Sequence, residues 1–133
     1  MCTILLIDDD RSFTGHIEAY VAERYPRIKL ISCNNPLEAL RMIAVEQYDL
    51  ILIDLEMPAL DGRKMMNFAL QAGIKPANIV LLSGHDADYL HTICPSGSCL
   101  AVLNKFETRQ REVLDMIFSS LSAKAGKGEV CAS

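Results

Sequence analysis

One stretch of sequence decides the fold, and it reads Tyr48-Asp49-Leu50-Ile51-Leu52-Ile53-Asp54-Leu55-Glu56-Met57-Pro58-Ala59-Leu60-Asp61-Gly62. Its four consecutive apolar residues, from Leu50 to Ile53, are typical of a short strand that is buried on both faces of a parallel sheet. Asp54 follows at the carboxyl end of this strand, where open α/β sheets bind their ligands. Pro58 turns the chain because proline cannot extend a strand ladder, and Asp61 is suited to cap a following helix. The alternative is that Asp54 merely ends a strand, and the rest of the chain argues against it.

The size and charge of the chain exclude several classes of protein. The chain has 133 residues, of which 50% are hydrophobic, and a formal net charge of -4. This length predicts one domain with a single core. The negative charge argues against direct binding to nucleic acid or to anionic membranes, both of which favour basic patches. No apolar run is long enough for a membrane span and the N-terminus lacks a signal-peptide pattern, so we expect a cytoplasmic protein whose cysteines are free thiols.

Strand and helix patterns alternate five times along the chain. Apolar runs predict strands at residues 4–7, 28–33, 50–53, 78–82 and 99–103. Helical spacing and capping residues predict helices at residues 12–25, 36–44, 64–72, 86–93 and 107–122. This alternation predicts an α/β fold, a doubly wound parallel sheet covered by helices on both faces. The known flavodoxin-like (βα)5 arrangement, with strand order 2-1-3-4-5, suits five such units.

Polar groups follow four strands that would be neighbours in this sheet, namely Asp8 with Asp9, then Asp54, Ser83 and Lys105. Two carboxylates about 4 Å apart repel by roughly 4 kcal/mol at an effective dielectric constant near 20. A raised pKa on one carboxyl group would offset this repulsion, and so would a divalent cation. Carboxylates, a backbone carbonyl and water match the octahedral oxygen shell of Mg²⁺. A metal, a lysine and a hydroxyl around one carboxylate predict phosphoryl transfer at Asp54.

In their order and spacing, these residues resemble the receiver domain of bacterial two-component response regulators, the CheY-like superfamily. The resemblance covers about Thr3 to Leu121 and includes the loop from Met57 to Gly62. It implies that Asp54 is the phosphoacceptor and that Ser83 and Lys105 assist its chemistry. It also implies a set of Mg²⁺ ligands, which would be Asp8, Asp9, Asp54 and the backbone carbonyl of Glu56.

The resemblance further implies a function in a phosphorelay. A receiver takes a phosphoryl group from the phosphohistidine of a sensor histidine kinase or phosphotransfer protein, and then switches a partner-binding surface. It catalyses its own phosphorylation and dephosphorylation but is not otherwise an enzyme. Its partners would include a downstream effector or a fused output domain, and a second copy bound through the face formed by helix 4, strand 5 and helix 5. We assign residues 1–122 to the receiver domain and residues 123–133 to a flexible tail or the start of a linker.

The sequence departs from the family pattern at two positions. The family usually has proline after the lysine, often with a cis peptide, whereas Phe106 follows Lys105 here. A non-proline cis bond costs about 2.5–4 kcal/mol, which leaves the geometry of this loop open. The family also often has an aromatic switch residue three positions before the lysine. That position is Val102 here, so the usual aromatic switch cannot operate.

Two alternatives remain open at this stage. A haloacid-dehalogenase-like phosphatase would use Asp8 as its nucleophile, with Asp10, Ser83 and Lys105 in support. The chain is short for that class, no acidic pair follows Lys105, and Asp54 would have no role. The other alternative is a binding module that keeps the fold without being phosphorylated. If the receiver hypothesis holds, the positions of Glu56 and His85 would influence how readily water reaches the phosphoryl group.

Overall fold

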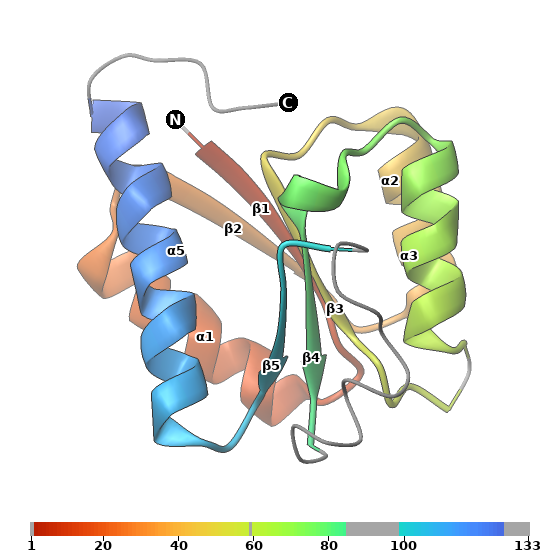
Figure 1. Ribbon diagram of the computed structural model, residues 1–133, viewed down its shortest axis with the longest axis horizontal. Coiled ribbons are helices and arrows are strands. Elements are labelled where there is room, and N and C mark those ends of the chain that lie inside the picture. Colours follow the sequence, from red (N-terminus) through yellow and green to blue (C-terminus); the bar gives the residue numbers. More distant parts are fainter. Residues whose placement is uncertain (1, 59, 85–98, 127–133) are drawn as a thin grey trace.

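The computed structural model describes residues 2–58, 60–84 and 99–126. Within these residues one five-stranded parallel sheet has the order β2-β1-β3-β4-β5 (Figure 1). The strands are β1 (Cys2–Ile7), β2 (Ile28–Cys33), β3 (Leu50–Asp54), β4 (Ile79–Ser83) and β5 (Ala101–Asn104). The helices are α1 (Arg11–Arg24), α2 (Pro36–Val45), α3 (Gly62–Gln71) and α5 (Thr108–Gly126), with a short 3-10 helix η1 (Pro76–Asn78). The predicted fold class and strand order are confirmed.

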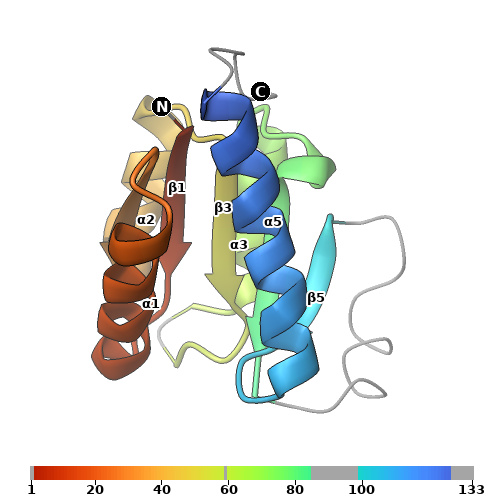
Figure 2. The same ribbon diagram turned by 90° about the vertical axis from the view of Figure 1, so that its left-hand side faces the viewer.

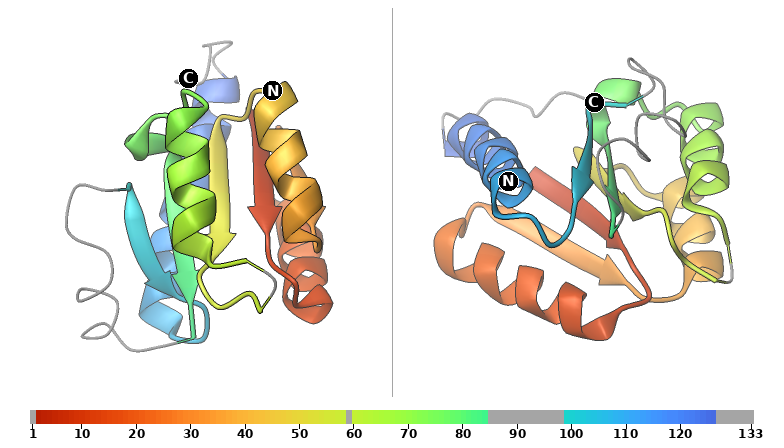
Figure 3. Two further views of the ribbon diagram at one scale, coloured as in Figure 1. Left: turned by 90° about the vertical axis from the view of Figure 1, so that its right-hand side faces the viewer. Right: turned by 60° about the horizontal axis from the view of Figure 1, so that its bottom comes forward.

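Helices cover both faces of the sheet, as Figures 1, 2 and 3 show. On one face α1 and α5 pack on a core that includes Ile4, Leu6, Leu52, Val80, Ile17 and Phe118. On the other face α2 and α3 pack on a core that includes Leu5, Ile7, Ile51, Ile53, Ile43 and Met65. Successive residues of a strand point to opposite faces, so a strand between two helical layers needs an apolar residue at every position. This explains the unbroken apolar runs of the sequence.

Capping residues set where the helices begin. Asn35 caps α2 by accepting a hydrogen bond from Leu37 N, and Asp61 caps α3 by accepting one from Arg63 N, both as predicted. Helix α1 begins earlier than predicted because Asp10 is its N-cap and accepts hydrogen bonds from the backbone of the first turn. The side chain of the third consecutive aspartate is therefore engaged in capping α1.

Several predicted boundaries differ from the structure. Asn78 ends η1 rather than beginning β4, and β5 begins at Ala101 rather than at residue 99. Helix α5 continues past residue 122 to Gly126, so the first residues of the predicted tail are helical. The predicted helix at residues 86–93 lies outside the described residues.

Two further expectations concern cysteines and membranes. Cys33 is a free thiol as expected, whereas Cys2 is disulfide-bonded, so the expectation is wrong for Cys2. Among the described helices none combines the length and the apolar character that a membrane span requires.

A hydrogen-bonded cluster of Tyr20, Tyr25 and Asp115 connects α1 and the residue that follows it to α5. The Tyr20 hydroxyl donates a 2.6 Å hydrogen bond to Asp115 Oδ1, and the Tyr25 hydroxyl donates to the same oxygen. These bonds lower the pKa of Asp115 below its usual range. Burial, followed by the Asp115 hydrogen bond, raises the pKa of Tyr25 to about 12. The cluster therefore stabilises the packing of the two helices through an ionised Asp115.

This cluster predicts a pH dependence of stability. Because the pKa of Asp115 is lower in the folded state, its contribution is present above the unfolded value of about 3.9 and is lost as the pH falls through the folded pKa. The unfolding free energy of the wild type should therefore exceed that of Asp115→Asn by more at pH 7 than at pH 3. Urea unfolding at the two pH values measures this difference. If the difference in unfolding free energy were the same at pH 7 and pH 3, the ionised Asp115 carboxylate would contribute nothing to stability.

Candidate functional site

The carboxyl edge of the sheet brings the predicted site residues together. Strand β1 pairs with β3 at Ile7 and Ile53, so the next residues, Asp8 and Asp54, emerge side by side. Ser83 ends β4, and Lys105 directly follows the last residue of β5. Each of these side chains comes directly from a strand end, so the rigid sheet determines where it lies.

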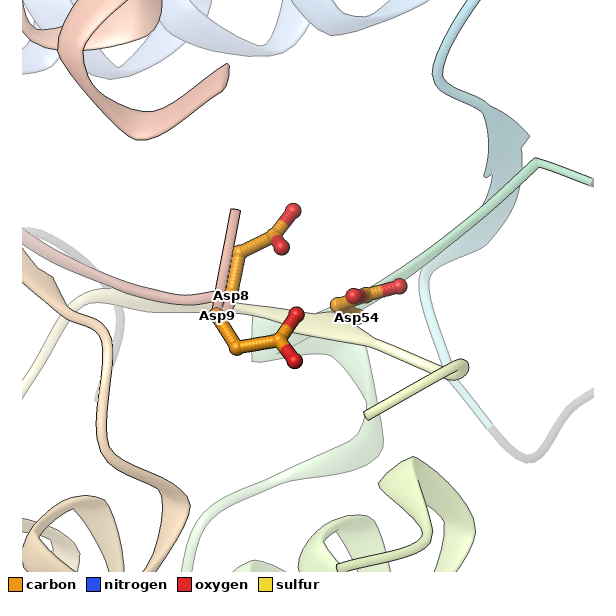
Figure 4. A group of neighbouring side chains, drawn as sticks. All are labelled: Asp8, Asp9 and Asp54. Atoms are coloured by element: carbon orange, nitrogen blue, oxygen red, sulfur yellow. The ribbon is translucent and has the colours of Figure 1, made fainter. Parts of the chain in front are cut away.

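Three carboxylates form a cluster at this edge. Asp8, Asp9 and Asp54 project into the same space (Figure 4), and one carboxylate oxygen of each lies within 4.8 Å of the others. Asp8 is fully buried and Asp54 is 3% exposed, whereas Asp9 faces solvent. Asp8 is further held by a 2.9 Å hydrogen bond from Asp10 N to its Oδ1. The cluster is thus a fixed group of carboxylates that opens to solvent at Asp9.

The environment of Asp54 disfavours its charge. Burial, followed by the charge of Asp8, raises the pKa of Asp54 to about 7. Glu56 N donates a 3.1 Å hydrogen bond to Asp54 Oδ1, and this bond acts in the opposite direction, as does the charge of Lys105. The net rise shows that the nearby protein groups do not fully compensate two buried carboxylates, so a cation beside them would be stabilised.

Lys105 supplies a positive charge to this cluster. It is 8% exposed, and its Nζ lies 2.6 Å from Asp8 Oδ2 and 3.9 Å from Asp54 Oδ2. The Nζ also lies 4.5 Å from the centre of the Phe13 ring, a cation–π contact with α1. The sequence suggested Asp54 as the partner of this lysine, and the structure shows that its closer partner is Asp8.

The loop after Lys105 has an ordinary backbone. No cis peptide bond occurs among the described residues, so the Lys105–Phe106 bond is trans. The Asn104 side-chain oxygen accepts hydrogen bonds from Phe106 N at 2.8 Å and from Glu107 N at 3.2 Å. These bonds turn the chain from β5 toward α5. The loop therefore makes its turn with a trans peptide, without the proline that the family usually has after the lysine.

Ser83 makes a side-chain contact that the sequence did not predict. Its hydroxyl donates a 2.6 Å hydrogen bond to Glu56 Oε2, and the next backbone amide, Gly84 N, donates a 2.7 Å bond to Glu56 Oε1. Sequence reasoning considered only the backbone carbonyl of Glu56 and the influence of its position on water access. His85, the other residue expected to affect water access, lies outside the described residues.

Gly62 is a second residue whose importance the sequence did not reveal. A Cβ atom at this position would lie 2.4 Å from the Asp54 carbonyl oxygen and 2.7 Å from Leu55 Cα. The first turn of α3 therefore packs directly on the backbone of the candidate phosphoacceptor, where no other residue type fits without movement.

Comparison with known proteins decides the family. Residues 4–118 match the family described as response regulator receiver domain. The chain belongs to this family. Among solved structures, this receiver is similar to the receiver domain of Francisella response regulator 1452, with a TM-score of 0.74, 22% identity, and coverage of 90% of this chain and 98% of that chain. It is similar to the Mg²⁺-BeF complex of response regulator TrrA from Thermotoga maritima, with a TM-score of 0.74, 21% identity and the same two coverages.

A curated relative adds a comparison at the level of sequence. The receiver is 29% identical over 84 residues to a protein-glutamate methylesterase/protein-glutamine glutaminase of Gluconobacter oxydans, which covers 62% of this chain and 23% of the relative. The chain thus spans about a quarter of the length of that protein. Family membership supports a role in phosphorelay signalling in general, and receiver domains are generally not enzymes of the ordinary kind.

The receiver's acidic cluster fits a magnesium ion. Asp8 Oδ2 is buried, and it accepts no hydrogen bond of normal geometry from the described residues, although the Lys105 ammonium lies close to it. Clustered carboxylate oxygens suit a hard divalent cation, and the exposed Asp9 leaves room for the water ligands that Mg²⁺ retains. The donor set is therefore appropriate for Asp8, Asp9 and Asp54 to hold this metal.

The phosphatase alternative does not fit the receiver. In that alternative Asp8 and Asp10 would act together, but the Asp10 side chain caps α1 through Ser12 N at 3.0 Å and Phe13 N at 3.2 Å. The phosphatase hypothesis also leaves Asp54 without a role, although Asp54 lies in the same carboxylate cluster as Asp8.

Proposed function

We propose that this receiver accepts a phosphoryl group on Asp54 from the phosphohistidine of a sensor histidine kinase or a phosphotransfer protein, in a Mg²⁺-dependent reaction. The observation that supports this most directly is the convergence of Asp8, Asp9 and Lys105 on Asp54 at the edge of the sheet. Carboxylates and an ammonium around one acceptor provide the positioning and charge compensation on which phosphoryl transfer depends.

The two oxygens of Asp54 have different neighbours, which supports different roles for them. Oδ1 accepts the hydrogen bond from Glu56 N, whereas Oδ2 lies on the side of Lys105. In this proposal Oδ2 is the nucleophile: it would form the new oxygen–phosphorus bond while the phosphorus–nitrogen bond of the donor breaks and the imidazole leaves. When bound, Mg²⁺ would neutralise charge on the transferred group, and Asp8, Asp9, Asp54 and the Glu56 carbonyl would hold it. Lys105 and the Ser83 hydroxyl would then contact phosphoryl oxygens.

The same groups would serve dephosphorylation, in which water attacks the phosphorus, the bond between phosphorus and Asp54 breaks, and inorganic phosphate leaves the restored carboxylate. In this sense the receiver promotes its own phosphorylation and dephosphorylation. The partners of the phosphorylated state would be a downstream effector or output domain, or a second copy bound through the face of helix 4, β5 and α5. Val102 on β5 cannot act as an aromatic switch, so the signal would pass through the loops after Ser83 and Lys105. We keep residues 1–122 as the receiver unit of this proposal and residues 123–133 as the segment that follows it, of which residues 123–126 continue α5.

The test is the intact mass of the protein after incubation with acetyl phosphate and Mg²⁺. The wild type should gain one phosphate and Asp54→Asn none, because the nucleophilic oxygen is lost. Asp10→Asn is the matched control: it removes an equal charge from the same edge but keeps a good helix cap, so it should be phosphorylated normally.

Two other results would contradict the proposal. Labelling that persists in Asp54→Asn but disappears in Asp8→Asn would favour the phosphatase alternative. A folded wild type that gains no mass from acetyl phosphate or from any histidine-phosphorylated donor would favour a binding module that is not phosphorylated.

A further inference from the structure

The Glu56 carboxylate occupies a two-donor anion site at the end of β4. One of its oxygens accepts the Ser83 hydroxyl at 2.6 Å, and the other accepts Gly84 N at 2.7 Å. Hydrogen bonds to an ionised acceptor are shorter and stronger than neutral ones, and here two donors bind the two oxygens of one group. Ser83 and Gly84 therefore bind an anion, and this anion is a side chain of the same protein.

This anion site lies beside Asp54. Strand β3 pairs with β4 at Asp54 and Leu82, and beyond that pair Leu55 N donates a 2.8 Å hydrogen bond to Leu82 O. The segment from Asp54 to Glu56 therefore runs alongside the segment that leads to Ser83 and Gly84. A phosphoryl group on Asp54 would present its oxygens to the same hydroxyl and amide that Glu56 now binds.

Other groups limit the space around these donors. A Cβ atom at Gly84 would lie 3.2 Å from Cε2 of the Phe106 ring and 3.4 Å from Glu56 Oε1. A phosphoryl group and the Glu56 carboxylate are both anionic, so they would repel each other if both approached Ser83 and Gly84. Each donor hydrogen can serve only one of them fully.

We propose that Glu56 is an internal competitor of the phosphoryl group: it holds the Ser83 hydroxyl and the Gly84 amide before phosphorylation, and it must leave them when Asp54 carries a phosphoryl group. This inference rests on the proposed phosphorylation of Asp54. Glu56 thereby lowers the affinity of the site for phosphoryl groups and sets how readily the receiver switches. It is a positioning residue that acts through Ser83 and Gly84 and does not itself take part in the transfer.

The test uses beryllofluoride with Mg²⁺ as a stable probe of the phosphorylated site. Removing a competitor held by charge-assisted hydrogen bonds should tighten beryllofluoride binding by about tenfold or more in Glu56→Ala. Glu56→Gln keeps the size of the side chain but loses the charge and one acceptor oxygen, so it should tighten binding by a smaller factor. Calorimetric titration of the three proteins gives the dissociation constants.

A matched control separates this contact from a general effect of charge. Glu46→Gln removes the same charge from an exposed residue at the C-terminal end of α2, in the segment that leads to the start of β3. It should leave beryllofluoride affinity unchanged. Without any ligand, the Gly84 amide proton should move upfield in the NMR spectrum of Glu56→Ala, because its hydrogen bond to a carboxylate is lost. The rest of the spectrum reports whether the variant is folded.

The outcomes distinguish this inference from the proposed function. If acetyl phosphate labels Asp54 but Glu56→Ala binds beryllofluoride no more tightly than the wild type, the competition is overturned and the phosphoacceptor role stands. An unmoved Gly84 amide in folded Glu56→Ala would also overturn it. If the wild type neither gains phosphate nor binds beryllofluoride, the proposed function fails and this inference fails with it.

Discussion

Gly62→Ala is expected to lower the free energy of unfolding by about 1–3 kcal/mol, the usual effect of forcing extra volume into a packed site. The methyl group would lie 2.4 Å from the Asp54 carbonyl oxygen and 2.7 Å from Leu55 Cα. Both are backbone atoms, so neither can rotate away as a side chain could, and the strand end or the start of α3 must move.

The same substitution should slow phosphorylation by about a hundredfold, because a displacement of about 1 Å at a reacting group can have an effect of that size. The position of the Asp54 carboxylate depends on the backbone that the methyl group displaces. Urea unfolding measures the first effect, and the rate of mass gain with acetyl phosphate measures the second.

Gly15→Ala is the matched control for this prediction. Gly15 lies on the exposed side of α1, and a Cβ atom added there would meet no described residue outside its own stretch of helix within 4 Å. Alanine should therefore be neutral there or stabilise the helix by up to about 1 kcal/mol. If Gly62→Ala matched Gly15→Ala in both stability and rate, the contact between α3 and the Asp54 backbone would be too soft to constrain the site.

The sequence predicts the scaffold of the candidate site because the relevant signals are local. Apolar runs identify strands, and the residue after each run lies at the carboxyl edge of a parallel sheet. Asp8, Asp54 and Ser83 lie at that edge for this reason alone. The caps Asn35 and Asp61 are equally local, since each binds an amide two residues further along the chain.

Three consecutive aspartates show where local signals end. Asp8 is buried against Lys105, Asp9 faces solvent in the carboxylate cluster, and Asp10 caps a helix. The three residues are chemically identical, so residue type alone cannot tell their roles apart. Only the exact start of α1 relative to the end of β1 separates them, and helix boundaries are what sequence patterns locate least precisely.

The side-chain partners at the site could not be predicted, because they depend on competition among groups from different strands. Lys105 had two carboxylates within reach, and its distance to Asp8 is the shorter. From the sequence, Glu56 was expected to supply a backbone carbonyl and to affect water access, yet its side chain connects the loop after β3 to the end of β4 through Ser83 and Gly84. Neither contact has a signature in the spacing of residues.

Lys105→Met is expected to lower the unfolding free energy of the metal-free receiver by about 3–5 kcal/mol, the usual effect of removing one partner of a buried ion pair. Asp8 is fully buried, and its contact with the lysine Nζ is 2.6 Å. Methionine has a similar volume and fills the space beside Phe13, so the loss should come from the unpaired charge of Asp8 rather than from a cavity.

Magnesium should reverse much of that loss. In the wild type a metal beside Asp8 and Asp54 must approach the Lys105 ammonium, and this repulsion is absent in Lys105→Met. Since a ligand stabilises the folded state according to its affinity, Mg²⁺ should raise the unfolding free energy more in the variant than in the wild type. Urea unfolding with and without saturating Mg²⁺ measures the two increments, with Lys64→Met on the exposed side of α3 as the control. Equal increments in all three proteins would mean that Lys105 and the metal do not compete for the same carboxylates, and that the lysine already lies where phosphoryl oxygens would need it.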